Sequence, residues 1–232
     1  MKKKSLAVIT ARGGSKRIPH KNIKEFCGKP IIAYSIEAAL KSEIFDEVMV
    51  STDDEEIKKI AIEYGAKIPF MRSEKTSNDY AATHEVLLEV LDEYKKMDIY
   101  FEYMCCIYPT APFVDATKLK KAFEKLNESD VDLVYPIVSY SFPPQRAVKL
   151  VDGHAEFLKP ENMFVRSQDL EKIYHDCGQF YFLNVASFEK ERKLILDKNS
   201  PLIVDELEMQ DIDNIEDWKL AELKYKLLKG KI

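Results

Sequence analysis

Short apolar runs alternate along the chain with segments in which apolar residues recur every three or four positions. The short runs predict buried strands, because a strand covered on both faces is apolar almost throughout. These runs are Ser5–Thr10, Glu47–Thr52, Lys67–Met71, Tyr103–Tyr108, Asp132–Val138 and Gln179–Leu183. The amphipathic segments predict helices that begin at Pro30 and about Asn214 and that cover Asp54–Tyr64, Thr83–Lys95 and Ala116–Leu126.

This alternation predicts an α/β fold of the Rossmann-like kind, with a mostly parallel central sheet flanked by helices. Ligands of such sheets bind beyond the carboxyl ends of the strands. A site is therefore expected among the loops after Thr10, Thr52, Met71 and Tyr108. Because no internal repeat or long linker interrupts the pattern, residues 1–232 are predicted to form a single domain.

The alternation breaks after Val138, where residues 139–177 are rich in proline, charge and aromatic side chains. Asp152-Gly153 within this stretch is typical of a hairpin turn. Loops that are long for a compact domain usually carry a function. Residues 140–175 are therefore predicted to form an inserted excursion from the sheet.

Composition argues against several classes of protein. The net charge of −5 and the pI near 5.6 disfavour a dedicated nucleic-acid binder, which is usually basic. No apolar stretch approaches the ~18 residues of a membrane span, and no signal peptide follows the first lysines, so a cytoplasmic protein is expected. The four cysteines include no C-x-x-C pair, which disfavours a zinc site and suits reduced thiols.

Positive charge is concentrated in the loop after the first strand, from Ala11 to Asn22. Two adjacent glycines, Gly13 and Gly14, allow a tight turn that presents backbone N–H groups to an anion. Four side chains can supply positive charge to a triphosphate, namely Arg12, Lys16, Arg17 and Lys21. The spacing matches neither a Walker loop nor G-x-G-x-x-G, which disfavours a nicotinamide dehydrogenase. The loop indicates phosphate binding, with a merely solvated loop as the alternative.

The strand and the loop A-R-G-G-S-K-R-I-P-H-K-N together resemble the N-terminal signature of the CMP-sialic acid synthetase family of cytidylyltransferases. Further segments are similar to family motifs in the same order, namely C-G-K-P with I-A-Y-S-I, V-S-T-D-D, P-T-A-P, R-S-Q-D-L and Q-D-I-D. Cys106–Phe113, Phe142–Arg146 and Tyr174–Tyr181 are most similar to the branch that uses pseudaminic acid.

The resemblance implies a nucleotide-diphospho-sugar transferase fold and an activity. That activity would join CMP from CTP to the anomeric hydroxyl of pseudaminic acid, an acidic nine-carbon sugar, for surface glycan or flagellin glycosylation. A CMP-N-acetylneuraminate or CMP-legionaminate synthetase is the alternative within the family, and a CTP or sugar-acid sensor is the non-enzymatic one. Because the family is commonly dimeric, the excursion over 140–175 is expected to be the dimerisation arm of a homodimer, with neither nucleic acid nor membrane as a partner.

The resemblance also assigns roles to individual residues. Catalysis is expected of Arg12, Lys21 and Asp211. The expected nucleotide contacts are Ala11, Arg12, Gly13, Gly14, Ser15, Lys16, Lys21, Asn22, Arg72, Asp79 and Ala81. The expected contacts with the sugar are Tyr108, Thr110, Arg166, Gln168, His175, Gln179 and Tyr181, with Arg166 on the sugar carboxylate. For His175, a structural histidine satisfied by the backbone is the alternative.

A divalent metal is expected at Asp211 and Asp213, whose alternation would project both carboxylates to one side of a strand. Two carboxylates together with substrate phosphates suit Mg²⁺, or Mn²⁺ in its place. The alternative is that Asp213 caps the last helix with Glu216 as its third residue.

Overall fold

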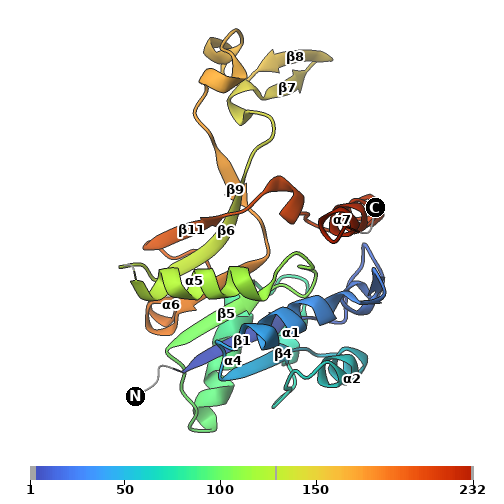
Figure 1. Ribbon diagram of the computed structural model, residues 1–232, viewed down its shortest axis with the longest axis vertical. Coiled ribbons are helices and arrows are strands. Elements are labelled where there is room, and N and C mark those ends of the chain that lie inside the picture. The colour runs from blue at the N-terminus through green and yellow to red at the C-terminus, as the bar shows by residue number, and fades with distance from the viewer. Residues whose placement is uncertain (1–3, 129, 231–232) are drawn as a thin grey trace.

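The computed structural model describes residues 4–128 and 130–230. Within this part of the chain, a seven-stranded sheet has the order β11-β6-β10-β5-β1-β4, and β9 pairs with β6 beside β10. The strands are β1 (Ser5–Thr10), β4 (Glu47–Ser51), β5 (Tyr103–Ile107), β6 (Leu133–Ser139), β9 (Tyr174–Asp176), β10 (Phe180–Asn184) and β11 (Asn199–Ile203). All run in one direction except β9 and β10, so the expected mostly parallel sheet is confirmed (Figure 1).

Helices cover both faces of this sheet (Figure 1). One face packs against α1 (Ile31–Ser42), α2 (Glu55–Glu63) and α5 (Ala116–Glu128), and the other against α4 (Thr83–Lys96) and α6 (Val185–Glu191). Successive residues of a strand point to opposite faces, and the adjacent Cys105 and Cys106 accordingly belong to the two different cores. Burial on both faces explains why the strands are apolar runs.

A third buried cluster joins the two ends of the chain. It packs α7 (Ile215–Leu228) against the small hairpin of β2 (Glu25–Phe26) and β3 (Lys29–Pro30). The Phe26 and Trp218 rings meet edge to face with centroids 5.6 Å apart. Ile18 from the basic loop and Ile212 from the D-I-D segment are buried in the same cluster. This packing brings the basic loop and the acidic segment together.

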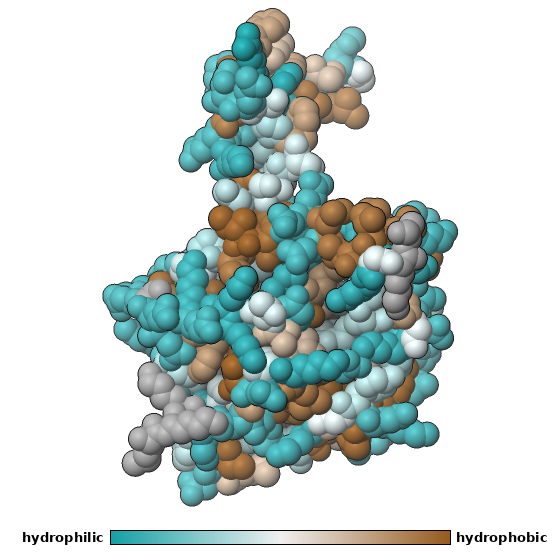
Figure 2. Space-filling model, in the orientation of Figure 1, coloured by the Kyte–Doolittle hydropathy of each residue, from teal (hydrophilic) through white to brown (hydrophobic). Residues whose placement is uncertain are grey.

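The predicted excursion leaves the sheet after β6 and returns at β9, forming an arm that projects away from the body of the protein (Figure 1). Its hairpin pairs β7 (Val148–Val151) with β8 (His154–Phe157). The turn between them is the predicted Asp152-Gly153, with φ values of 49° and 82° that a type I′ turn requires. Hydrophobic surface is visible on the narrow arm (Figure 2), where Leu150 is 80% and Phe164 88% exposed.

Several sequence predictions need correction. Lys67–Met71 is not a strand, because it makes only one isolated bridge, from Lys67 to Met49, before Pro69 turns the chain away. The segment with Asp211 and Asp213 does not form a strand, and Asp213 lies in a bend. Strands β9 and β11 and helix α6 were not predicted. The described residues contain no helix that is long and apolar enough to span a membrane.

Candidate active site

A cavity of about 440 Å³ opens at the edge of the sheet where β1 and β5 end side by side. The residues around it come from the loop after β1 and from the segment after β5, as the parallel topology predicts. They are Thr10, Arg12, Ser15, Lys16, Arg17, Lys21, Asn22, Tyr108, Pro109 and Thr110. The volume is within the range of small-molecule sites.

The loop that forms one side of this cavity is held tightly against the end of β4. The Gly13 amide donates a 3.0 Å hydrogen bond to Asp53 Oδ1. A Cβ at position 13 would lie 2.5 Å from Asp54 Oδ2, so only glycine allows this close approach. Asp54 is itself fixed, because it caps α2 by accepting from the amides of Glu56 and Ile57. Asn22, which is buried, donates to the Arg12 carbonyl at 2.9 Å.

A second cavity, of about 160 Å³, adjoins the first, and both are lined by Thr10 and Arg12. Its other lining residues are Arg72, Thr76, Asn78, Ala81, Thr83 and Val86. The buried Arg72 guanidinium makes two hydrogen bonds to Ser51. Its Nε donates to Ser51 Oγ at 3.0 Å, and its Nη2 donates to the Ser51 carbonyl at 2.6 Å. Burial lowers the pKa of Arg72, against the opposing effect of Asp53 and Glu89.

Two of the expected nucleotide residues have other partners in this structure. The buried Ala11 donates its amide to the Ser51 carbonyl at 3.0 Å, so it continues the β1–β4 pairing. The carboxylate of Asp79 pairs with both Arg12 and Lys16. Hydrogen bonds from Lys16 and then Arg12 lower the pKa of Asp79. Asp79 thus pairs with two of the cations that were expected at the phosphates.

Lys21 connects the basic loop to the acidic segment. Its Nζ donates a 2.9 Å hydrogen bond to the carbonyl of Ile212. Burial lowers the pKa of Lys21, whereas the nearby carboxylates of Asp213 and Asp211 act in the opposite direction. Arg17 reaches the same segment and pairs with Asp213 at 2.8 Å. The expected phosphate cations and the expected metal carboxylates therefore lie together.

The alternative role of Asp213 as a helix cap is wrong. Asn214 caps α7 instead, with its side chain accepting from the amides of Glu216 and Asp217. Asp217, rather than Glu216, completes the capping box and also accepts from the Asp213 amide at 3.0 Å. The Asp213 carboxylate is thereby left for Arg17 or a cation.

Asp211 and Asp213 suit a hard divalent ion but do not enclose one. Ile212 between them is buried, whereas Asp211 is exposed and Asp213 is partly so. Among the described residues, no group of three or more His, Cys, Asp or Glu side chains is placed to hold a metal. Mg²⁺ commonly binds one or two carboxylates and completes its shell with phosphates and water. The pair fits that pattern of incomplete protein ligation.

The residues expected to contact the sugar are only partly brought together. Tyr108 and Thr110 line the larger cavity, and the Tyr108 hydroxyl lies 3.3 Å from Thr83 Oγ1 of the smaller one. Tyr181 is 3% exposed, with its ring centroid 5.6 Å from that of Tyr108. Its hydroxyl donates to Asp176 at 2.5 Å, so Asp176 joins this group although sequence reasoning gave it no role.

Gln179 and His175 make backbone contacts instead. Gln179 is 3% exposed, and its Nε2 donates to the Glu208 carbonyl at 2.7 Å. His175 Nδ1 lies 2.9 Å from the Asp176 carbonyl, which favours the structural alternative for this histidine. Arg166 and Gln168 are exposed on the arm and line neither cavity.

Other lining residues were not predicted, namely Thr10, Thr76, Asn78, Thr83 and Val86. The signal for Thr10 was its place at the end of the first strand. Thr76, Asn78 and Thr83 come from a polar stretch that spacing alone does not single out.

Residues 6–218 match the family model described as Cytidylyltransferase. The chain belongs to the cytidylyltransferase family. This cytidylyltransferase is 40% identical over 225 residues to the pseudaminic acid cytidylyltransferase of Campylobacter jejuni, covering 97% of both chains. It is 36% identical to the CMP-N,N'-diacetyllegionaminic acid synthase of Legionella pneumophila, covering 94% of both. The family resemblance in the sequence motifs is confirmed.

A solved structure supports the fold. A CMP:2-keto-3-deoxy-manno-octonic acid synthetase complexed with CTP superposes with a TM-score of 0.68, covering 98% of this cytidylyltransferase and 99% of that chain. At 18% identity, this likeness supports the fold alone. The predicted nucleotidyltransferase-like architecture is confirmed.

Proposed function

We propose that this cytidylyltransferase transfers CMP from CTP to the anomeric hydroxyl of pseudaminic acid and releases pyrophosphate. The branch is supported by the 40% identity to pseudaminic acid cytidylyltransferases of Campylobacter jejuni, which exceeds the 36% to the legionaminic acid enzyme. One structural observation carries the chemistry: the contact of Lys21 with Ile212 places a basic loop and two carboxylates beside one cavity.

The reaction is a displacement at the α-phosphorus of CTP. The sugar hydroxyl forms the new P–O bond, its proton is lost, and the bond to pyrophosphate breaks. Arg12, Lys16 and Lys21 face the cavity and would neutralise the charge that develops on the phosphates. Removal of one such preorganised group typically lowers kcat by roughly 100-fold or more. Asp79 would release Arg12 and Lys16 as the phosphates arrive.

We assign a divalent Mg²⁺ or Mn²⁺ to Asp211 and Asp213. The ion would supply positive charge at the phosphate oxygens. Asp213 is already held beside Arg17, and Lys21 lies between the segment and the cavity. These two residues would set the direction from which the triphosphate approaches the carboxylates.

The smaller cavity would receive the cytosine base. Arg72 and Ala81 line it, and Arg12 stands where it meets the larger cavity. The sugar would then lie toward Tyr108 and Thr110 in the larger cavity. The base and the acceptor would then occupy adjoining cavities that share Thr10 and Arg12.

We also propose a homodimer in which the arm reaches the partner. Arg166 and Gln168 lie on the arm, outside the two cavities of their own chain, and the arm carries exposed apolar side chains. A planar guanidinium binds a carboxylate in bidentate fashion. Arg166 would therefore bind the sugar carboxylate in the site of the partner.

The test is pyrophosphate release from CTP and Mg²⁺ with pseudaminic, legionaminic or N-acetylneuraminic acid in separate reactions. We expect release with pseudaminic acid and its loss in Asp211→Ala. Release with a different acid would keep the reaction and overturn the assigned sugar. No release with any acid, while CTP still binds, would overturn the proposed activity in favour of a sensor.

A further inference from the structure

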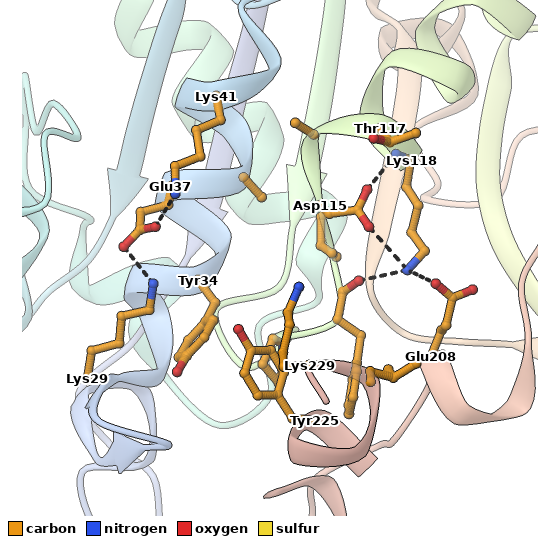
Figure 3. A pocket seen from close by; sticks show the side chains of 16 residues that line it. Lys29, Tyr34, Glu37, Lys41, Asp115, Thr117, Lys118, Glu208, Tyr225 and Lys229 are labelled. Atoms are coloured by element: carbon orange, nitrogen blue, oxygen red, sulfur yellow. Dashed lines mark hydrogen bonds and ion pairs between the residues drawn. The ribbon is translucent and has the colours of Figure 1, made fainter. Parts of the chain in front are cut away.

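A cleft of about 460 Å³ lies between α1, the start of α5 and α7, apart from the candidate active site. Two groups of charged side chains stand on its opposite walls (Figure 3). On one wall, Glu37 of α1 pairs with Lys29 and Lys41. On the other, Lys118 of α5 points between Asp115 and Glu208 (Figure 3).

Lys118 is unusual because it is a lysine with only 8% of its surface exposed. Its Nζ donates to the Phe113 carbonyl at 2.9 Å and lies 2.8 Å from Glu208 Oε1 and 3.7 Å from Asp115 Oδ2. A buried ammonium is tolerated when it is paired and hydrogen-bonded. Glu208 is the nearer carboxylate and the one that lies far away in sequence.

The backbone of Glu208 is also held, by a residue of the sheet region. Its carbonyl accepts the 2.7 Å hydrogen bond from the buried Gln179. The Gln179 carbonyl in turn accepts from the Tyr108 amide at 2.9 Å. Glu208 is therefore fixed both to the start of α5 and to the edge of the larger cavity.

The residues around Glu208 are fixed as well. Lys224 of α7 donates to the carbonyls of Glu206 at 3.2 Å and Met209 at 2.8 Å. Asp211 follows two residues after Met209, and Lys21 then holds Ile212 from the other side. The acidic segment thus lies between two anchored points, Met209 and Ile212, and Lys118 holds the side chain of Glu208, the residue just before the first of them.

We infer that Lys118 is a positioning residue that acts through Glu208 to set where Asp211 and Asp213 meet a divalent ion. This rests on the metal site of the proposed function. Residues that orient metal ligands from behind typically change metal affinity by roughly 10- to 100-fold when they are removed. Lys118 would do so without contacting substrate or metal.

The opposite wall of the cleft supplies a matched control. Glu37 makes 2.6 Å contacts with both Lys29 and Lys41, so its loss breaks two ion pairs of the same cleft. Those pairs join β3 to α1 and lie within α1, and none of their members contacts Glu208. Glu37→Gln therefore tests whether any disturbance of the cleft has the same effect.

The experiment measures the affinity for CTP by calorimetry, once with EDTA and once with saturating Mg²⁺, without any sugar acid. We expect Mg²⁺ to tighten CTP binding by the wild type, and Asp211→Ala to abolish this gain. Lys118→Met and the isosteric Glu208→Gln should bind CTP in EDTA as tightly as the wild type does. In both variants, the increase in CTP affinity caused by Mg²⁺ should be roughly tenfold smaller. Glu37→Gln should behave as the wild type.

Several outcomes would overturn the inference. A full Mg²⁺ gain in Lys118→Met or in Glu208→Gln would do so, as would an equal loss in Glu37→Gln. If Lys118→Met fails to fold, Glu208→Gln decides alone. If the wild type shows no gain or Asp211→Ala keeps it, the metal site of the proposed function fails first and the inference falls with it.

Discussion

The ammonium of Lys21 donates a 2.9 Å hydrogen bond to the carbonyl of Ile212, which lies 191 positions later in the chain. Ile18 and Ile212 are buried in one cluster behind this contact, so the packing of α7 sets its geometry. The basic loop alone would be only a candidate anion-binding element. Its contact with Ile212 gives it two carboxylates as neighbours.

Lys21→Met should lower kcat by roughly 100-fold or more, because it removes the cation that we propose stabilises the phosphates. Lys21→Arg should restore only part of the activity, because the larger guanidinium must fit beside the Ile212 carbonyl. Pyrophosphate release measures both variants. If the activity of Lys21→Met stays within a few-fold of the wild type, Lys21 is not a catalytic residue.

Stability should depend on pH through the same residue. Burial lowers the pKa of Lys21 from its ordinary value of 10.5, so between the lowered pKa and 10.5 the unfolded chain binds more protons than the folded one. The free energy of unfolding therefore rises with pH across that window. We expect the wild type to gain stability relative to Lys21→Met as the pH rises toward 10.5 in denaturant titrations. An opposite trend would contradict the assigned cause.

Asp79→Asn should tighten CTP binding. The Asp79 carboxylate pairs with Arg12 and Lys16 at an exposed position, so phosphates must compete with it. Exposed ion pairs are weak, and the expected gain is roughly threefold. Calorimetry with CTP measures this gain. Weaker binding by tenfold in Asp79→Asn would mean that this carboxylate contacts the nucleotide.

Tyr181→Phe should raise KM for the sugar acid more than KM for CTP. The Tyr181 hydroxyl donates to Asp176, and its ring lies against Tyr108 on the proposed acceptor side. A lost hydrogen bond to a charged group also destabilises by ~1.5–3 kcal/mol. Steady-state kinetics and thermal unfolding measure the two effects. Asp176→Asn should reproduce the kinetic effect, and equal changes in both KM values would contradict the assigned side.

Leu150→Glu combined with Phe164→Glu on the arm should convert a dimer into a monomer. These side chains are 80% and 88% exposed, and a carboxylate in an apolar interface is strongly unfavourable. Ile62→Glu on α2, at a position 53% exposed, is the control away from the arm. Sedimentation velocity measures the mass. A wild type that sediments as a monomer would rule out the proposed assembly.

Much of the fold followed from local pattern. The start of a helix can be predicted from nearby residues, because the capping side chain and the amides that donate to it lie within one turn. Asp54 and Asn214 are examples. Strands buried on both faces are also recognisable in the sequence as apolar runs. Strand β11 was not predicted, because it lies at the edge of the sheet and contains Pro201. The prediction of a strand over Lys67–Met71 was wrong for the opposite reason. This segment is an apolar run, but it makes only an isolated bridge and no ladder of strand hydrogen bonds.

By itself, the sequence determined the alternating fold, the basic loop at a strand end and the membership of the cytidylyltransferase family. Only the tertiary structure decided that Lys21 meets Ile212, that Gln179 holds Glu208, and that Asn214 rather than Asp213 caps α7. The physical reason is that a side chain's role depends on which polar groups it meets after packing. For Lys21 and Gln179, those partners are brought near by buried clusters and not by the spacing of residues.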